Sequence, residues 1–300
     1  MNKIYEDKVR LLVRILPYVA KEKIFALKGG SAINLFYKDL PRLSVDIDLS
    51  YILFDKRDVA YKNINSSLGK ISRNLKNIGI KSVLMGQENK KLVCFDNLTT
   101  IKIEPNYVIR GFIFEPIEME TCETVNKSFG YAKMKVISKN ELYGGKICAA
   151  LDRQHPRDLF DIKEIIDSNE LTGDIIKGFI IMLLGHDRTF HDLLNPNISD
   201  KQIVLEKDFI GMTNKSFTYK NHLETLKKLI IIIRENMEQY KNVLLKFVSL
   251  DKTWIQDIDI PNIEKLPAIQ WKIKNLEKLK QTNIKKFEEQ YDKLAEIFLN

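Results

Sequence analysis

The sequence lacks any apolar run approaching the ~20 residues needed to cross a bilayer. Even the aliphatic stretch Leu229–Ile233 is bracketed by lysines and Arg234. The first ten residues, MNKIYEDKVR, contain no apolar core of the kind that a secretory signal requires. These absences argue against a membrane or secreted protein, and they predict a soluble protein of the cytoplasm.

Cysteine and histidine are also scarce, with three and four copies in 300 residues. The cysteines form no C-x-x-C pair and have no histidine at ligand spacing: Cys94, Cys122 and Cys148. The histidines are equally scattered: His155, His186, His191 and His222. This pattern excludes a disulfide framework and a zinc site of the usual spacing, and it predicts reduced, mostly buried thiols.

Neither sign of charge dominates, although the net charge is +8. Residues 1–125 carry 20 basic and 15 acidic side chains, residues 126–200 carry 10 and 11, and residues 201–300 carry 18 and 14. A basic surface favours contacts with phosphate groups, but this excess is also compatible with ordinary lysine-rich helices. With 44% hydrophobic residues, the chain can bury one large core or two modest ones.

The first half of the chain alternates between strand and helix patterns. An amphipathic opening helix is expected to stop at Pro17, and Gly79 is suited to end a helix that begins at Arg57. The remaining elements are expected as strands at 24–28, 45–51, 80–85, 91–95 and 100–105, with a short helix at 31–37. This order predicts a mixed sheet with helices packed on it.

After residue 137 the pattern becomes helical. Ser138 and Glu141 have the spacing of a capping box, and Pro156 is well placed as the first residue of a helix. Further helices are expected at 142–151, 156–166, 175–184, 199–205 and 219–249, and the last 30 residues also have helical spacing. The sequence thus predicts an α+β protein, with a core domain at 1–137 and an all-α domain at 138–300.

A pair of carboxylates, Asp46 and Asp48, lies on the second expected strand. Residues two apart on a strand point to the same side, so the two acids would face away from Val45, Ile47 and Leu49. Like charges held this close repel each other, and a divalent cation relieves the repulsion. Carboxylate oxygens suit Mg²⁺, which completes its ligand shell with substrate phosphates.

A phosphate site is expected close to this pair, at Gly29-Gly30-Ser31. Glycines allow the backbone to approach an anion, and the free N–H groups and dipole of a helix that opens at Ser31 favour negative charge. Lys28 could neutralise phosphate charge from the preceding position. Ser31 could donate to a phosphate or merely cap the helix.

The order and spacing of these two motifs resemble the signature of the DNA polymerase β-like nucleotidyltransferases. A second block, from Lys146 through Arg153 to Arg157-Asp158 and Asp161, narrows the resemblance. Together the blocks resemble the AbiEii toxin family, the nucleotidyltransferase half of type IV toxin–antitoxin and phage abortive-infection systems, whose relatives include the MenT toxins. The resemblance covers the chain from about Lys28 to Asp161.

The resemblance implies further site residues. A neighbouring strand usually supplies a third carboxylate, and Glu104 is assigned to this role, as a metal ligand or as the base on the acceptor hydroxyl. Lys102, Glu104 and Asn106 alternate with apolar residues and would share one face. Arg42 and Ser44 match an R-x-S-x-D-I-D pattern of these toxins, and Ser44 would help to bind the nucleotide.

The second block would bring cations to the nucleotide. Lys146 and Arg153 are two helical turns apart and would share a face, so that Lys146 could stabilise the leaving pyrophosphate. Lys146 and Asp161 match functional positions of the family. Arg153, Arg157 and Asp158 are assigned to nucleotide binding, although a salt-bridged helix pair without a chemical role would look the same.

The implied function is transfer of a nucleoside monophosphate from an NTP, with Mg²⁺, to an acceptor such as the 3′ end of a tRNA. A separately encoded antitoxin would counter the toxin, possibly without touching it. Two alternatives stay open. The acceptor could be a hydroxyl of a protein or of a small molecule such as an antibiotic, or the chain could be a nucleotide-binding or partner-binding module without catalytic activity.

Overall fold

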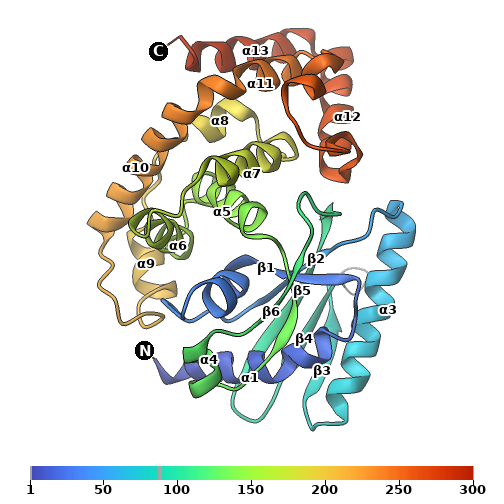
Figure 1. Ribbon diagram of the computed structural model, residues 1–300, viewed down its shortest axis with the longest axis vertical. Helices are drawn as coiled ribbons and strands as arrows, with labels where there is room; N and C mark the ends of the chain where they lie inside the picture. The colour runs from blue at the N-terminus through green and yellow to red at the C-terminus, as the bar shows by residue number, and fades with distance from the viewer. Residues whose placement is uncertain (1, 87–89, 300) are drawn as a thin grey trace. The chain divides into compact units, whose positions relative to one another are not determined.

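The chain has the mixed α+β architecture that the sequence predicts (Figure 1). The computed structural model describes residues 2–86 and 90–299. It separates into two compact units, one formed by Met1–Leu142 with Phe209–Ser216 and the other by Tyr143–Asp208 with Phe217–Asn300. In the described part of the chain, no helix is long and apolar enough to cross a membrane.

A seven-stranded mixed sheet forms the first unit, in the order β3-β4-β5-β2-β1-β7-β6. Its strands are β1 Phe25–Lys28, β2 Ile47–Tyr51, β3 Lys81–Met85, β4 Lys91–Phe95, β5 Thr100–Arg110, β6 Ile117–Glu120 and β7 Lys133–Val136. Strands β2 and β5 are parallel, as are β1 and β7, and the other neighbours are antiparallel. The sequence predicts the first five strands but misses β6 and β7.

Buried and exposed residues alternate along β5, and the buried ones mark the side of the sheet that the helices cover. Ile101 and Ile103 of β5 are buried, whereas Lys102 is exposed and Glu104 is half-buried. On the buried side, helices α1 Lys3–Val19 and α3 Arg57–Lys76 pack against the sheet. The Ser72 hydroxyl of α3 lies 2.8 Å from that of Ser82 on β3. The period-two pattern of the strands therefore predicts both faces correctly.

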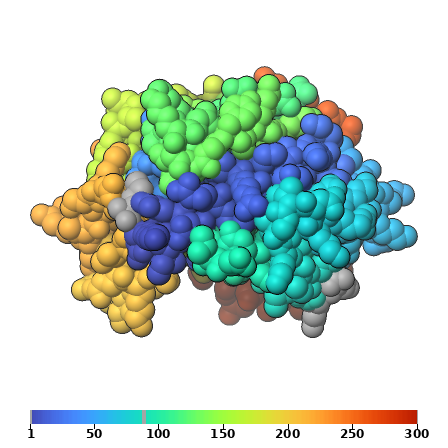
Figure 2. All heavy atoms as spheres, turned by 90° about the horizontal axis from the view of Figure 1, so that it is seen from below, coloured from blue at the N-terminus to red at the C-terminus, as the bar shows by residue number. Residues whose placement is uncertain are grey.

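Helices α1 and α3 lie side by side (Figure 2, dark blue and cyan), and Arg14 of α1 donates to the carbonyl of Ile78 at 2.9 Å. The prediction that α1 stops at Pro17 is wrong, since the helix runs on to Val19. A proline removes one backbone donor, and in the last turn of a helix that loss leaves the helical path intact. The amide of Ala20 still donates to the Leu16 carbonyl at 2.9 Å.

The short helix after β1 begins earlier than predicted. It starts at Gly29 as α2 Gly29–Ala32 and continues as the π-helix η1 Ile33–Tyr37. Another short helix, α4 Glu123–Ser128, precedes β7 and was not predicted. A six-residue helix leaves too little periodicity for a sequence pattern to detect.

The second unit is helical. Its elements are α5 Lys139–Arg153, whose first turn belongs to the first unit, α6 Pro156–Asp167, α7 Gly173–Leu184, α8 Phe190–Leu194, α9 Gln202–Asp208, α10 Tyr219–Met237, η3 Glu238–Tyr240, α11 Lys241–Val248, η4 Lys252–Asp257, η5 Ile263–Lys265, α12 Pro267–Thr282 and α13 Ile284–Ile297. The single helix predicted at 219–249 is thus divided by η3. Pro156 begins α6 as predicted.

Close backbone packing joins α5 to α7 in the second unit. A Cβ atom at Gly144 would overlap the backbone of Gly178 and Phe179. Only glycine at position 144 permits this approach. The contact fixes the part of α5 that continues toward Lys146 and Arg153.

Candidate functional site

Three charged residues form a row across neighbouring strands of the first unit. Lys28 of β1 is the register partner of Asp48 of β2, and Asp48 is in turn the partner of Glu104 of β5. Register partners lie about 5 Å apart and point to the same face of the sheet. Asp48 and Glu104 are both partly exposed. The structure thereby brings together two acids that are separated by 55 residues in the sequence.

Asp46 lies just outside the strand, because β2 begins at Ile47 and not at Val45 as predicted. The expected alternation is nevertheless present: Val45, Ile47 and Leu49 are buried, while Asp46 and Asp48 are half-buried. The backbone carbonyl of Asp46 accepts a hydrogen bond from the Ser31 hydroxyl at 2.5 Å. This contact ties the Asp-x-Asp motif to the glycine turn.

The glycine turn is shaped around Asp48. Gly29 has φ +71°, in the left-handed region that favours glycine, and a Cβ atom there would overlap the Asp48 carboxylate. A Cβ atom at Gly30 would lie 2.7 Å from Nη2 of Arg42 and 2.9 Å from Oγ of Ser44. The two glycines therefore let this turn, here called the glycine cradle, pack directly against the side chains of Asp48, Arg42 and Ser44, and no larger residue fits at either position.

Buried polar side chains support this cradle. The Ser31 hydroxyl donates to Oγ of Ser44 at 3.1 Å, and the Arg42 guanidinium donates to the Leu43 carbonyl at 3.0 Å. Ser31, Arg42 and Ser44 are all buried. Ser44 therefore contacts the Gly29-Gly30-Ser31 turn through Ser31. This buried contact gives Ser44 a packing role, in addition to its predicted role in nucleotide binding.

A distant segment completes the support. Residues 209–216 return to the first unit, where the Leu43 amide donates to the Met212 carbonyl at 2.7 Å. The Thr213 hydroxyl donates to the Pro41 carbonyl at 2.8 Å. Nothing in the sequence indicates this contact, since about 170 residues separate the two segments and neither carries a motif for the pairing.

Glu141 lies near Lys28 and is a candidate site residue, although its position in the sequence indicates only a capping box. The Ser138 hydroxyl accepts from the Glu141 amide at 3.5 Å, but the Glu141 carboxylate does not complete the box. It accepts from the amides of Ile113 at 2.8 Å and Phe114 at 3.4 Å. The side chain is turned inward because two otherwise unpaired loop amides need an acceptor.

Burial couples Glu141 to Lys28 electrostatically. Burial raises the pKa of Glu141 to about 7, although the two amides and Lys28 oppose the rise. Burial also lowers the pKa of Lys28, and the carboxylates of Asp48 and Glu141 partly restore it. Lys28 thus remains next to two acids that favour its charged form, at the edge of the glycine cradle.

A second charged cluster lies in the second unit. Nζ of Lys146 contacts Oδ1 of Asp158 at 2.8 Å and Oδ2 of Asp161 at 2.9 Å. Nε of Arg153 contacts Oδ2 of Asp158 at 2.6 Å. The lysine and both aspartates are buried, whereas 59% of the Arg153 side chain is exposed. Lys146 and Arg153 lie on one face of α5, as their seven-residue spacing predicts, and both contact the carboxylate of Asp158. This is also the ion-paired arrangement that the alternative without a chemical role predicts.

The electrostatics of this cluster favour its charged form. Burial alone would raise the pKa of Asp158, but the charges of Lys146 and Arg153 and their hydrogen bonds outweigh it and hold the pKa below its usual range. Arg157 is half-buried in the first turn of α6, where its amide donates to Nδ1 of His155 at 3.1 Å. Asp158 and Arg157 are neighbours in the first turn of α6, but Asp158 is buried whereas Arg157 is half-buried.

Among residues 2–86 and 90–299, no group of three or more acidic, histidine or cysteine side chains is close enough to hold a metal ion. Glu104 instead lies 3.6 Å from Nζ of Lys91. The residues present still fit Mg²⁺, which needs only one or two carboxylates together with substrate phosphates. The half-buried carboxylates of Asp46 and Asp48, with the Gly29 backbone packed directly against Asp48, are the observation that supports this fit.

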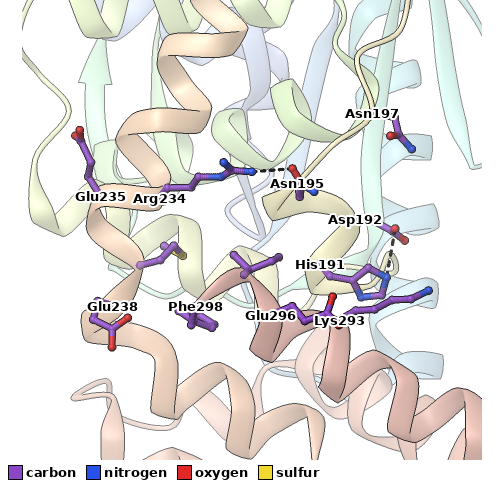
Figure 3. A pocket seen from close by; sticks show the side chains of 12 residues that line it. His191, Asp192, Asn195, Asn197, Arg234, Glu235, Glu238, Lys293, Glu296 and Phe298 are labelled. Carbon is purple, nitrogen blue, oxygen red and sulfur yellow. Dashed lines mark hydrogen bonds and ion pairs between the residues drawn. The ribbon is translucent and has the colours of Figure 1, made fainter. Parts of the chain in front are cut away.

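The second unit also contains a cavity of about 590 Å³ lined by α8, α10, η3 and α13 (Figure 3). Arg234 donates to Oδ1 of Asn195 at 2.7 Å, and Nε2 of His191 lies 3.5 Å from Oδ1 of Asp192. Acidic and basic side chains are mixed along its wall. None of the residues predicted to act on a nucleotide lines this cavity.

Comparisons with known proteins find a matching family model and a similar fold. The family model described as "Nucleotidyl transferase AbiEii toxin, Type IV TA system" matches residues 10–275. The fold is similar to that of MenT4, a nucleotidyltransferase toxin from Mycobacterium tuberculosis H37Rv, with a TM-score of 0.60, 11% identity, and coverage of 91% of this chain and 93% of that chain. No curated protein matches the sequence.

Proposed function

Because the chain belongs to the AbiEii family of nucleotidyltransferase toxins of type IV toxin–antitoxin systems, we propose that it transfers a nucleoside monophosphate from an NTP to a hydroxyl of an RNA, such as the 3′ end of a tRNA. The observation that carries the proposal is the row Lys28–Asp48–Glu104 beside the glycine cradle. Carboxylates and a cation share one sheet face next to the glycine turn, which supports a phosphate-transfer reaction on this face.

Asp46 and Asp48 are the proposed Mg²⁺ ligands. When bound, the ion offsets the negative charge of the triphosphate and of the group in transfer. Gly29 and Gly30 bring the backbone of the turn close to Asp48, where its amides would contact phosphate oxygens, and Ser31 anchors the turn through the Asp46 carbonyl. Lys28 supplies positive charge at the entrance of the same turn.

Glu104 is the proposed base. The acceptor hydroxyl attacks the α-phosphorus, forming a new P–O bond, while the bond to the bridging oxygen breaks and pyrophosphate leaves. Glu104, or water that it orients, takes the hydroxyl proton. The Lys91 ammonium 3.6 Å away offsets the charge of the glutamate before the acceptor arrives. As the alternative role, Glu104 would serve as a third metal ligand.

The second cluster is proposed to bind the nucleotide. Lys146 would stabilise the leaving pyrophosphate, for which its buried ammonium group would exchange Asp158 or Asp161 for a phosphate oxygen. Arg153 and Arg157 would supply further positive charge. A separately encoded antitoxin is the expected partner, and its action need not involve contact with this chain.

Transfer of label tests the proposal. Each of the four common α-³²P-labelled NTPs is incubated with Mg²⁺, total RNA and either the wild type or Asp46→Ala. Label in a discrete RNA band with the wild type alone is the expected result, and it identifies both nucleotide and acceptor. Label in a protein or a small molecule would replace the RNA acceptor by one of the alternatives, and NTP binding without any transfer would favour a non-catalytic module.

A further inference from the structure

The sheet face that carries Glu104 continues beyond the proposed site onto β4 and β3. We infer that this extension binds the single-stranded end of the acceptor RNA and directs its terminal hydroxyl to Glu104, an inference that rests on the proposed function. We call it the β3–β5 face. Its residues are Lys81, Val83, Met85, Lys91, Val93, Phe95, Thr100 and Lys102.

Strand register assigns these residues to the same side as the carboxylates. Val83 pairs with Val93, and Val93 pairs with Lys102. Lys102 and Glu104 are two residues apart on β5 and therefore share a face, as Glu104 and Asp48 do through their pairing. The row of charges and the β3–β5 face form one continuous surface of the first unit.

The opposite side of these strands is the helix-covered side. Leu92, Cys94 and Ile103 alternate with the face residues and are buried, and Ser82 contacts α3 through Ser72. In contrast, Val83 is 51% exposed and Met85 is 48% exposed. Large apolar side chains gathered on an open strand face commonly mark a binding surface.

The chemistry of the face suits a single-stranded nucleic acid. Lys81 and Lys102 are exposed and flank the apolar residues, while Phe95 is half-buried between them, as the register partner of Lys81 and of Thr100. Phe95 offers a ring on which a base can stack, and the lysines can contact backbone phosphates. Open sheets with an aromatic residue and basic neighbours bind two or three bases in this manner.

The dimensions agree with a short RNA end. Neighbouring strands are about 4.8 Å apart, so that β3 lies roughly 10 Å from β5, and the four steps from Lys91 to Phe95 span about 13 Å. Lys91 on β4 links the two outer strands of the face. It is the register partner of Met85 on β3, and its Nζ lies 3.6 Å from Oε1 of Glu104 on β5. A single-stranded RNA that lies over Phe95 and Val93 would place its terminal nucleotide at Glu104.

The test compares binding and catalysis in the full-length protein. Lys81→Gln/Lys102→Gln removes two charges from the β3–β5 face. Lys62→Gln/Lys76→Gln is the matched control, because both of its exposed lysines lie on α3, on the other side of the sheet. Phe95→Leu keeps an apolar side chain but removes the ring. The measurements are affinity for a fluorescein-labelled single-stranded RNA at several salt concentrations, KM for RNA, and KM for NTP.

We expect the face variant to weaken RNA binding several-fold and to lower the slope of log affinity against log salt by about 0.7 for each lysine. KM for RNA rises in this variant and in Phe95→Leu, whereas KM for NTP does not change. If the face variant has the same RNA affinity and the same salt slope as the control variant, the inference is overturned. It is also overturned if the wild type binds no single-stranded RNA, or if the wild type labels only a protein. RNA binding that depends on the face without any nucleotide transfer would support the surface and refute the proposed function instead.

Discussion

Asp48 and Glu104 lie directly opposite each other on the parallel strands β2 and β5. Two carboxylates in this relation repel each other, and the fold retains them although neither is fully exposed. Arrangements that weaken a fold in this manner are typical of sites that bind a cation or act on a substrate. The repulsion gives the first prediction.

Asp48→Asn should abolish transfer and change stability little. The substitution keeps the shape of the side chain but removes both the repulsion from Glu104 and the attraction to Lys28, two effects of opposite sign that are each worth about 0.2–1 kcal/mol. Nucleotide transfer should fall by about 100-fold or more, because a proposed metal ligand is lost. Thermal unfolding and the labelling assay measure the two effects. An active Asp48→Asn protein would contradict the assignment of Asp48.

Gly29→Ala should damage the site more than an equivalent change elsewhere. Alanine at the left-handed backbone of Gly29 costs about 1–2 kcal/mol, and its Cβ atom must also displace the Asp48 carboxylate. Gly79→Ala is the control, since Gly79 has a similar φ of +75° but no atom within 4 Å of the added Cβ. Both variants should lose stability, and only Gly29→Ala should lose transfer activity at temperatures where both remain folded.

Lys146→Met should destabilise the second unit strongly. Removing the lysine leaves Asp161 and Asp158 buried without their shared cation, and breaking a buried pair of this kind costs roughly 3–5 kcal/mol. Arg153→Met should cost less than about 1 kcal/mol, because most of its side chain is exposed. Chemical denaturation distinguishes the two. Equal losses for both variants would show that Lys146 is not the centre of the cluster.

The same cluster predicts acid sensitivity. The pKa of Asp158 is lower in the folded protein than its usual value, so its contribution to stability is present above that usual value, near 4, and is lost as pH falls below it. Asp158→Asn should therefore reduce stability near neutral pH and flatten the decline in acid. Unfolding midpoints measured from pH 6 downward test this. An unchanged decline in the variant would assign the acid sensitivity to other carboxylates.

Glu141 predicts a pH dependence of the opposite sign. Its pKa is raised from 4.5 to about 7 in the folded protein, so the folded state favours the protonated form. Stability from this group is greatest below pH 4.5 and declines until pH 7, by roughly 3 kcal/mol in total. In Glu141→Gln, which keeps an oxygen acceptor for the Ile113 amide, this decline should be absent. Unfolding free energies of wild type and variant at pH 5 and pH 8 give the comparison.

The local elements of the site follow from the sequence because short-range chemistry fixes them. Alternating apolar residues predict β4 at 91–95 with the bounds that the structure has, and Pro156 predicts the start of α6. The predictions fail where local chemistry is ambiguous. Pro17 falls in the last turn of α1 and does not end it, and Glu141 serves two distant loop amides where its spacing suggested a cap.

By itself, the sequence determined the α+β class, the Gly-Gly-Ser turn, the Asp46–Asp48 pair and the Lys146–Arg153 face, because each depends on backbone periodicity or on residues less than two helical turns apart. Only the tertiary structure decided that Glu104 is the neighbour of Asp48, that residues 209–216 support the Arg42–Ser44 segment, and that the lysines and apolar residues of the β3–β5 face share a surface with the carboxylates. Strand order and long-range packing minimise the free energy of the whole chain, and no local pattern encodes them.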